Sequence, residues 1–145
     1  MFHTMLAALE LRWVAATVAA ASNIDSNSSR IDMQDYESAM FIAPVTDSVA
    51  TGVATLKVEG NDADSDVGMA AIDGASVSLT SVANDDINNK LLIVEVRNPA
   101  TRYIQAVRTS AAANIAFGET VVLLKPREKK AVQGATVGAS AFVSD

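Results

Sequence analysis

Short runs of β-prone residues, each followed by a cluster of turn-forming residues, recur along most of this chain. Run 52–59 alternates apolar and polar residues, so Leu56 and Val58 are expected to point inward. Run 90–97 is apolar at both alternating sets of positions, which predicts a central strand. Six or seven such strands predict a mainly-β fold, an antiparallel β-sandwich or small barrel. The expected strands are 37–45, 52–59, 75–82, 90–97, 102–109 and 119–125.

Two local signals concern the order of these strands. Residues 98–101 are turn-prone and separate runs 90–97 and 102–109, which predicts a hairpin. Pro44 has no backbone N–H for a sheet ladder. The run 37–45 is therefore expected to lie at a sheet edge or to end at this proline.

Length and residue distribution predict one body with an extended arm at each end. A chain of 145 residues has the size of a single domain. We expect an N-terminal arm over 1–23, with a helical turn near 5–11, a β-sandwich body over 24–125 and a C-terminal arm over 126–145. The C-terminal arm ends in small residues without a helical period, so alone it is expected to be disordered or extended. Its Phe142 can dock, within an added strand, on a partner.

The apolar stretch 5–21 predicts neither a membrane anchor nor a signal peptide. It is short for a membrane span, contains Glu10 and Arg12, and is preceded by His3 instead of a lysine or arginine. We therefore expect a protein made in the cytosol and used there, or assembled there into a particle, with no membrane partner.

Charge and composition argue against several function classes. The net charge of −6 argues against binding nucleic acid through a basic surface. Cysteine is absent and His3 is the single histidine, so one chain can form neither a disulfide, nor a thiolate metal site, nor a histidine-based triad. The acidic residues fall in turn-rich segments. We expect no enzymatic activity and no cofactor.

One acidic loop resembles a cation-binding loop in part. Asp62, Asp64 and Asp66 alternate, as oxygen ligands do in calcium loops. Val67 and Asp73, however, stand where the helix–loop–helix calcium pattern needs glycine and glutamate. We favour a solvated acidic loop without a metal, and keep the three alternating aspartates as the candidate ligands.

Two further groups of residues are candidates for partner contacts. Lys125, Arg127 and Lys129 form a basic stretch that either docks on a partner or is a charged exit from the last strand. Arg102 followed by Tyr103 is typical of interface composition. An outward, solvated face is the alternative for this second group.

Five short segments of the chain stand in a characteristic order. They are MFHT at 1–4, LELR at 9–12, IDMQDYES at 31–38, TRYIQ at 101–105 and VVLLKPR at 121–127. In this order they resemble a family of small phage head proteins, the tailed-phage capsid decoration or cement proteins. Departures from the family pattern are Gln105, where a basic residue is common, and Asp35 with Tyr36, which replace a more usual Gly-Phe.

The resemblance implies a structural protein of the virion. Such proteins bind the outside of the head, which is assembled in the host cytoplasm, and cement neighbouring subunits of the major capsid protein, often as homotrimers. Their arms reach adjacent subunits, and many copies add avidity. On this basis we expect Arg102 and Tyr103 at the subunit interface. The expected capsid contacts are Leu11 and Trp13 in the N-terminal arm, and Lys125, Arg127, Lys129 and Phe142 in the C-terminal arm.

Two alternatives remain open from the sequence. The first is another virion role, as a head–tail connector or tail-tube subunit. The second is a calcium-dependent carbohydrate-binding module that uses loop 61–73 and Tyr103, although the chain has few aromatic residues for a sugar platform.

Overall fold

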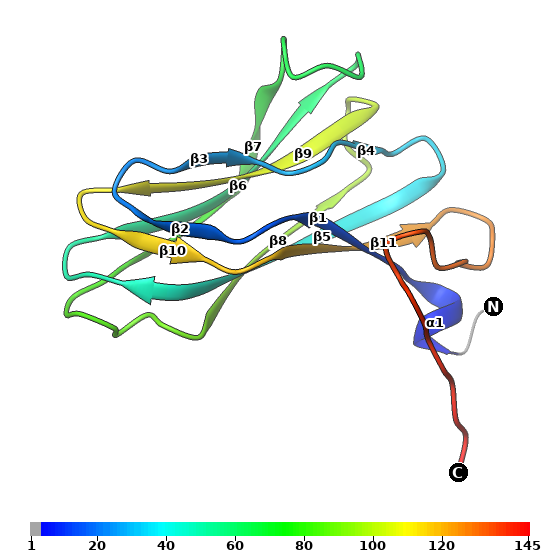
Figure 1. Ribbon diagram of the computed structural model, residues 1–145. Helices are drawn as coiled ribbons and strands as arrows, with labels where there is room; N and C mark the ends of the chain where they lie inside the picture. The colour runs from blue at the N-terminus through cyan, green and yellow to red at the C-terminus, as the bar shows by residue number, and fades with distance from the viewer. Residues whose placement is uncertain (1–3) are drawn as a thin grey trace.

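Two antiparallel sheets are stacked face to face in the computed structural model, which describes residues 4–145 (Figure 1). This arrangement confirms the predicted mainly-β sandwich; the sheets do not close into a barrel. The first sheet contains β1 (Glu10–Ala15), β2 (Val18–Ala21), β5 (Tyr36–Ser48), β8 (Lys90–Arg97), β10 (Ile115–Phe117) and β11 (Thr120–Pro126). The second contains β3 (Asp25–Asn27), β4 (Ile31–Asp32), β6 (Val53–Asn61), β7 (Ala70–Thr80) and β9 (Tyr103–Ala111).

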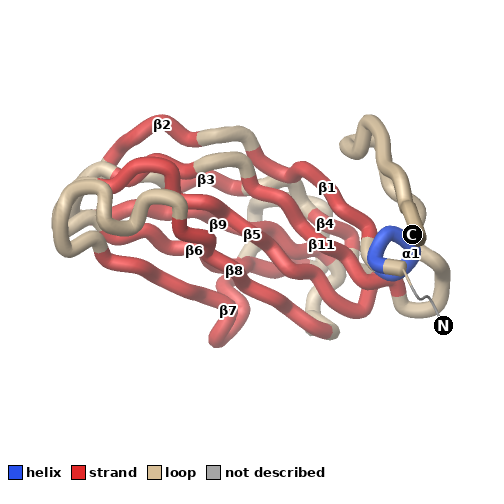
Figure 2. Tube along the Cα trace, turned by 90° about the horizontal axis from the view of Figure 1, so that it is seen from below, coloured by secondary structure: helices blue, strands red, loops and turns tan. Residues whose placement is uncertain are grey.

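Each sheet is four rows wide, because short consecutive strands lie in line with one another. In the first sheet β8 forms one edge and β5 follows it; β11 and β10 share the third row, and β1 and β2 share the other edge. In the second sheet the rows are β7, β6, β9, and then β3 with β4. Figure 2 shows these strands running along the length of the sandwich.

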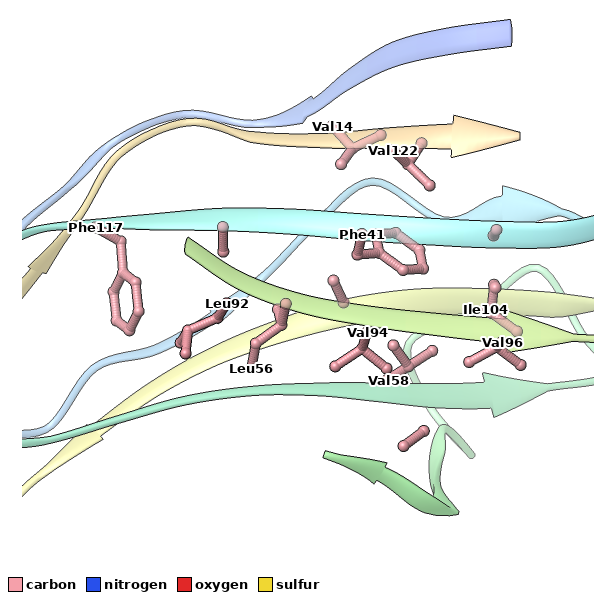
Figure 3. Packing of buried hydrophobic residues seen from close by; sticks show 14 of the residues in the cluster. Val14, Phe41, Leu56, Val58, Leu92, Val94, Val96, Ile104, Phe117 and Val122 are labelled. Atoms are coloured by element: carbon pink, nitrogen blue, oxygen red, sulfur yellow. The ribbon is translucent and has the colours of Figure 1, made fainter. Parts of the chain in front are cut away.

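The core between the sheets is filled by inward side chains of both (Figure 3). Leu56 and Val58 are fully buried, which confirms their predicted orientation. Phe41 from β5 and Phe117 from β10 are the large aromatic members, and most others are valine, leucine, isoleucine or alanine. Small aliphatic side chains suit a thin layer between two sheets that lie about 10 Å apart.

The prediction that 90–97 is a central strand is wrong. This segment is β8, which among the strands of residues 4–145 is paired only with β5 and forms an edge of the first sheet. Its inward set is buried, whereas Leu91 and Ile93 in its outward set are exposed. An apolar strand with two apolar faces is therefore not buried on both sides here.

The predicted hairpin is also wrong, because its two strands belong to different sheets. Strand β8 lies in the first sheet and β9 in the second, so residues 98–101 carry the chain across the sandwich.

Pro44 lies inside the central strand β5, and the expectation of an edge or a strand end at this position is wrong. Strand β5 is paired with β8 on one side and with β10 and β11 on the other. Pro44 lies beside the break between β10 and β11, where the Gly118 N–H donates to the Pro44 carbonyl at 2.9 Å. The register is interrupted there, so the missing proline N–H removes no regular ladder bond.

The structure places much of the predicted N-terminal arm in the first sheet. The short helix α1 (Met5–Ala8) is followed by β1 and β2, which form an edge of that sheet. His3 lies outside the described residues. After β11, residues 127–145 contain no strand and pass α1 before they leave the body (Figure 1). Within residues 4–145, no helix has the length and apolar character needed to cross a membrane.

Candidate functional site

The outer face of the first sheet is apolar across all four of its rows. Side chains alternate along a strand, so burial of Phe41 turns Met40 and Ile42 outward. The same alternation operates on β1, β8 and β11. We call this surface the outer apolar face; it consists of Leu11, Trp13, Met40, Ile42, Pro44, Leu91, Ile93, Val121 and Leu123.

Strand register joins these side chains into continuous lines that run across the strands. One line passes through Trp13, Val121, Ile42 and Ile93. The next line passes through Leu11, Leu123 and Met40 to Glu95 at the edge. Residues directly opposite each other on one face are in contact distance. The face therefore forms one apolar patch with a charge at its border.

Exposure on this face is greatest at its two edges. Trp13 on β1 is 54% exposed, and Leu91 and Ile93 on β8 are 57% and 45% exposed. Residues of the two middle rows are half-buried by their neighbours. Contiguous exposed apolar surface of this kind is typical of a site that binds another protein.

The outer face of the second sheet has the opposite character. Its outward positions on β6 and β7 include Thr55, Lys57, Ser76 and Ser78. The Thr55 and Ser78 hydroxyls form a hydrogen bond of 2.6 Å across the two strands. This polar surface suits contact with water, so the two faces of the sandwich differ in what they can bind.

The tail after β11 lies along the free edge of β1. Gln133 Oε1 accepts a hydrogen bond from the Leu11 N–H at 2.9 Å, and the Thr136 hydroxyl accepts one from the Trp13 N–H at 3.2 Å. Gln133 Nε2 also donates to the Leu9 carbonyl at 2.8 Å. We call residues 131–136 the strap. The strap begins at the buried Ala131, whose N–H donates to the Ala7 carbonyl at 2.8 Å, so it is fastened to the segment before β1 as well as to β1 itself.

Basic residues at the end of β11 are engaged within the chain. Lys125 and Arg97 both pair with the Glu37 carboxylate, at 3.6 and 2.7 Å. Desolvation acts to raise the pKa of Glu37, but these two cations outweigh it and hold that pKa below its ordinary value. Arg127 donates to the Asn98 side chain at 3.1 Å. Lys125 thus borders the outer apolar face as one member of an ion cluster.

A hollow of about 430 Å³ lies between the start of β1 and the segment after β11. Lys129, Glu10 and Tyr36 are among the residues that line it. The Tyr36 hydroxyl donates to Glu10 Oε1 at 2.9 Å, and the Arg12 guanidinium stacks over the Tyr36 ring at 5.4 Å. Desolvation by burial, together with the Glu10 hydrogen bond, raises the pKa of Tyr36. Sequence reasoning missed this cluster; its signal was a charged pair, Glu10 and Arg12, inside an apolar run.

Arg102 and Tyr103, the expected subunit interface, are paired inside the chain. The Arg102 guanidinium donates to both Asp32 carboxylate oxygens, at 3.0 and 2.8 Å. It also stacks over the Tyr103 ring at 5.2 Å. Tyr103 is the first residue of β9, in the second sheet, and Arg102 directly precedes it; a role in self-association stays a prediction.

Replacing Arg102 by alanine is expected to make the melting temperature fall less as the pH is lowered. The hydrogen bond from Arg102 lowers the pKa of Asp32, so the charged carboxylate stabilises the fold above the ordinary value of 3.8. That contribution is lost as the pH falls through the lowered pKa. Melting temperatures from about pH 6 down to about pH 2 measure this effect, because the loss falls below pH 3.8. An equal fall in the variant and the parent would contradict the assignment.

The aspartates of the acidic loop point to different protein partners. Asp64 pairs with Arg30 at 2.6 Å, and Asp66 accepts from Gln105 at 2.8 Å. Asp62 accepts from the Arg102 backbone N–H at 3.4 Å. Across residues 4–145, no group of three or more His, Cys, Asp or Glu side chains is placed to hold a metal. These contacts fasten the loop, which connects β6 and β7, to residues in and beside the second sheet.

The structure brings together only some of the expected contact residues. Leu11 and Trp13 lie on the outer apolar face and Lys125 lies at its border. Phe142 lies far along the tail, 62% exposed.

No protein-family model matches this chain, and no curated protein matches it. The outer apolar face is therefore the feature on which a function can be argued.

Proposed function

We propose that this protein is a structural protein of a phage virion that binds the outer surface of the capsid through its outer apolar face. The exposed apolar surface that crosses all four rows of the first sheet carries this proposal. The partner is the major capsid protein, and the protein cements neighbouring subunits by binding, without turnover. Self-association, as a homotrimer, is part of the proposal.

Charge and polarity support this orientation on the shell. With the outer apolar face on the capsid, the polar face of the second sheet would point to solvent. The net charge of −6 suits the outside of a particle better than a surface that faces DNA. A capsid repeats the same docking site many times, so each contact needs only modest affinity.

The proposal is tested by replacing Leu11 and Trp13 together with serine. We expect affinity for empty capsids, assembled from the major capsid protein of the same genome, to fall about 30-fold, because exposed tryptophans often dominate binding interfaces. Cosedimentation over a range of protein concentrations measures this affinity. The matched control is the double variant Thr55→Ala and Ser78→Ala on the polar face, which is expected to bind as the parent does.

Two outcomes would contradict the proposal. One is unchanged capsid binding by the Leu11 and Trp13 variant, with an unchanged melting temperature as evidence that it is folded. The other is binding of the parent to purified connector or tail-tube rings in place of capsids. This second outcome would favour the other virion role.

A further inference from the structure

We propose that residues 138–145 of one copy add to the free edge of β8 in a second copy as an extra antiparallel strand. This interface gives the contact for the self-association proposed above and rests on that part of the proposal; it needs no capsid, so its test can fail while capsid docking stands. It concerns a donor segment and an acceptor edge that lie in different parts of the same chain.

The acceptor is the edge of the first sheet formed by β8. The Asn98 N–H donates to the Glu37 carbonyl at 2.8 Å, which sets the phase of the β5–β8 ladder. Alternation then turns the backbone N–H and C=O groups of Leu91, Ile93 and Glu95 away from β5. Within the described part of the chain, β8 has no second strand partner.

The two edges of the first sheet differ in protection. On β1, the strap occupies the N–H groups of Leu11 and Trp13. On β8, exposed Leu91 and Ile93 lie beside unpaired backbone groups. A flat apolar edge of this kind is a template for pairing with another strand unless something covers it.

The donor is the segment that follows the strap. Residues 138–145 are exposed throughout, with Phe142 at 62% and Val143 at 81% exposure. In Figure 1 this segment leads away from the body. An extended segment with a bare aromatic side chain gains from pairing on a sheet edge, where backbone bonds supply affinity and side chains supply specificity.

The position of the strap makes a second copy the partner. The strap holds the tail on β1, which is the opposite edge of the sheet from β8. To reach its own β8, the tail would have to cross the outer face before pairing began. A tail that leads away from its own body is placed to reach a neighbour instead.

An antiparallel register gives complementary neighbours at three positions of the segment. With Phe142 opposite Ile93, Val143 lies opposite Leu92 and Asp145 lies opposite Lys90. Phe142 then extends the outer apolar face, and Val143 covers the side of the core. Lys90, which forms no ion pair among residues 4–145, gains a carboxylate partner. Each copy gives one tail and accepts one, so the contact is heterologous and can close into a ring.

The test uses two chains that are defective in different halves of the interface. The first lacks residues 138–145. The second carries Ile93→Pro, which removes an N–H that faces the free edge and leaves the ladder with β5 intact. Light scattering is expected to show an oligomer for the parent and a monomer for each defective chain. An equimolar mixture is expected to form a one-to-one dimer, because one chain keeps the tail and the other keeps the edge.

A conservative control is Ile93→Val, which keeps both the N–H and an apolar side chain and is expected to associate as the parent does. A parent that stays monomeric at all concentrations would overturn the proposal. Association of the shortened chain to the same extent as the parent would also overturn it.

A cross-link keeps the test decisive if Ile93→Pro does not fold. The chain has no cysteine, so introduced pairs react cleanly. We expect an intermolecular disulfide between a chain with Phe142→Cys and a chain with Ile93→Cys. The control pairs Phe142→Cys with Ile42→Cys. Ile42 lies opposite Ile93 on the neighbouring strand β5, one strand further from the edge. Equal yields from the two pairs would contradict the register and the interface.

Discussion

Replacing Phe41 by alanine is expected to lower the free energy of unfolding by about 4 kcal/mol, because large-to-small changes leave a cavity in a packed core. Phe41 is fully buried between the sheets, and its register neighbours are Val94 and Val122 (Figure 3). Urea denaturation measures the loss directly.

The matched control is Ile42→Ser on the same strand. Ile42 is the next residue but points to the outer apolar face, so its loss is expected to lower stability by about 1 kcal/mol or less. If this variant were as unstable as Phe41→Ala, the outer face would belong to the packed core. The docking proposal would then lose its basis.

Replacing Arg108 by alanine is expected to destabilise the protein by about 3 kcal/mol. Arg108 on β9 is only 2% exposed, and its NH1 donates to the Gly118 carbonyl of the opposite sheet at 2.8 Å. Its NH2 donates to the Ser26 hydroxyl at 3.2 Å. Alanine would leave a cavity and an unpaired buried carbonyl beside the break between β10 and β11.

Arg108→Met separates packing from hydrogen bonding in this variant. Methionine keeps much of the side-chain volume and removes a buried charge, whose desolvation also lowers the pKa of Arg108. We therefore expect a smaller loss for methionine than for alanine in the same denaturation experiment. Equal losses would show that the two hydrogen bonds, and not the filled volume, account for the stability.

The alternation of apolar and polar residues predicts which side chains face the core when the outward set is polar. It does not do so when both faces of a strand are apolar. Leu56 and Val58 lie on a strand with a polar outward set, so their orientation could be read from the sequence. Strand β8 is apolar on both sides because one side packs in the core and the other joins the outer apolar face. An apolar run does not distinguish burial in the core from exposure for binding.

The turn and site predictions failed for a related reason. Residues 98–101 reverse the chain, but a turn does not say whether the next strand stays in the same sheet. The sequence predicts a strand that begins at Arg102, and β9 begins one residue later, at Tyr103; the partner of Arg102, Asp32, is 70 positions away in the chain. The sequence also predicts Leu11 and Trp13 as contact residues. It does not show that Trp13 lies in one line with Ile93 across the sheet, because that depends on strand register. Contacts between distant segments are fixed by tertiary structure.

The position of β11 has a consequence for how the chain folds. In the described part of the chain, strand β1 is paired only with β11, which lies between β1 and β5. Among the strands of residues 4–145, only β6 and β7 are both consecutive and paired with each other. Most of the sheet therefore requires the closure of long loops, which predicts folding on a timescale of roughly milliseconds to seconds. During synthesis, β1 therefore has no strand to pair with until β11 has left the ribosome.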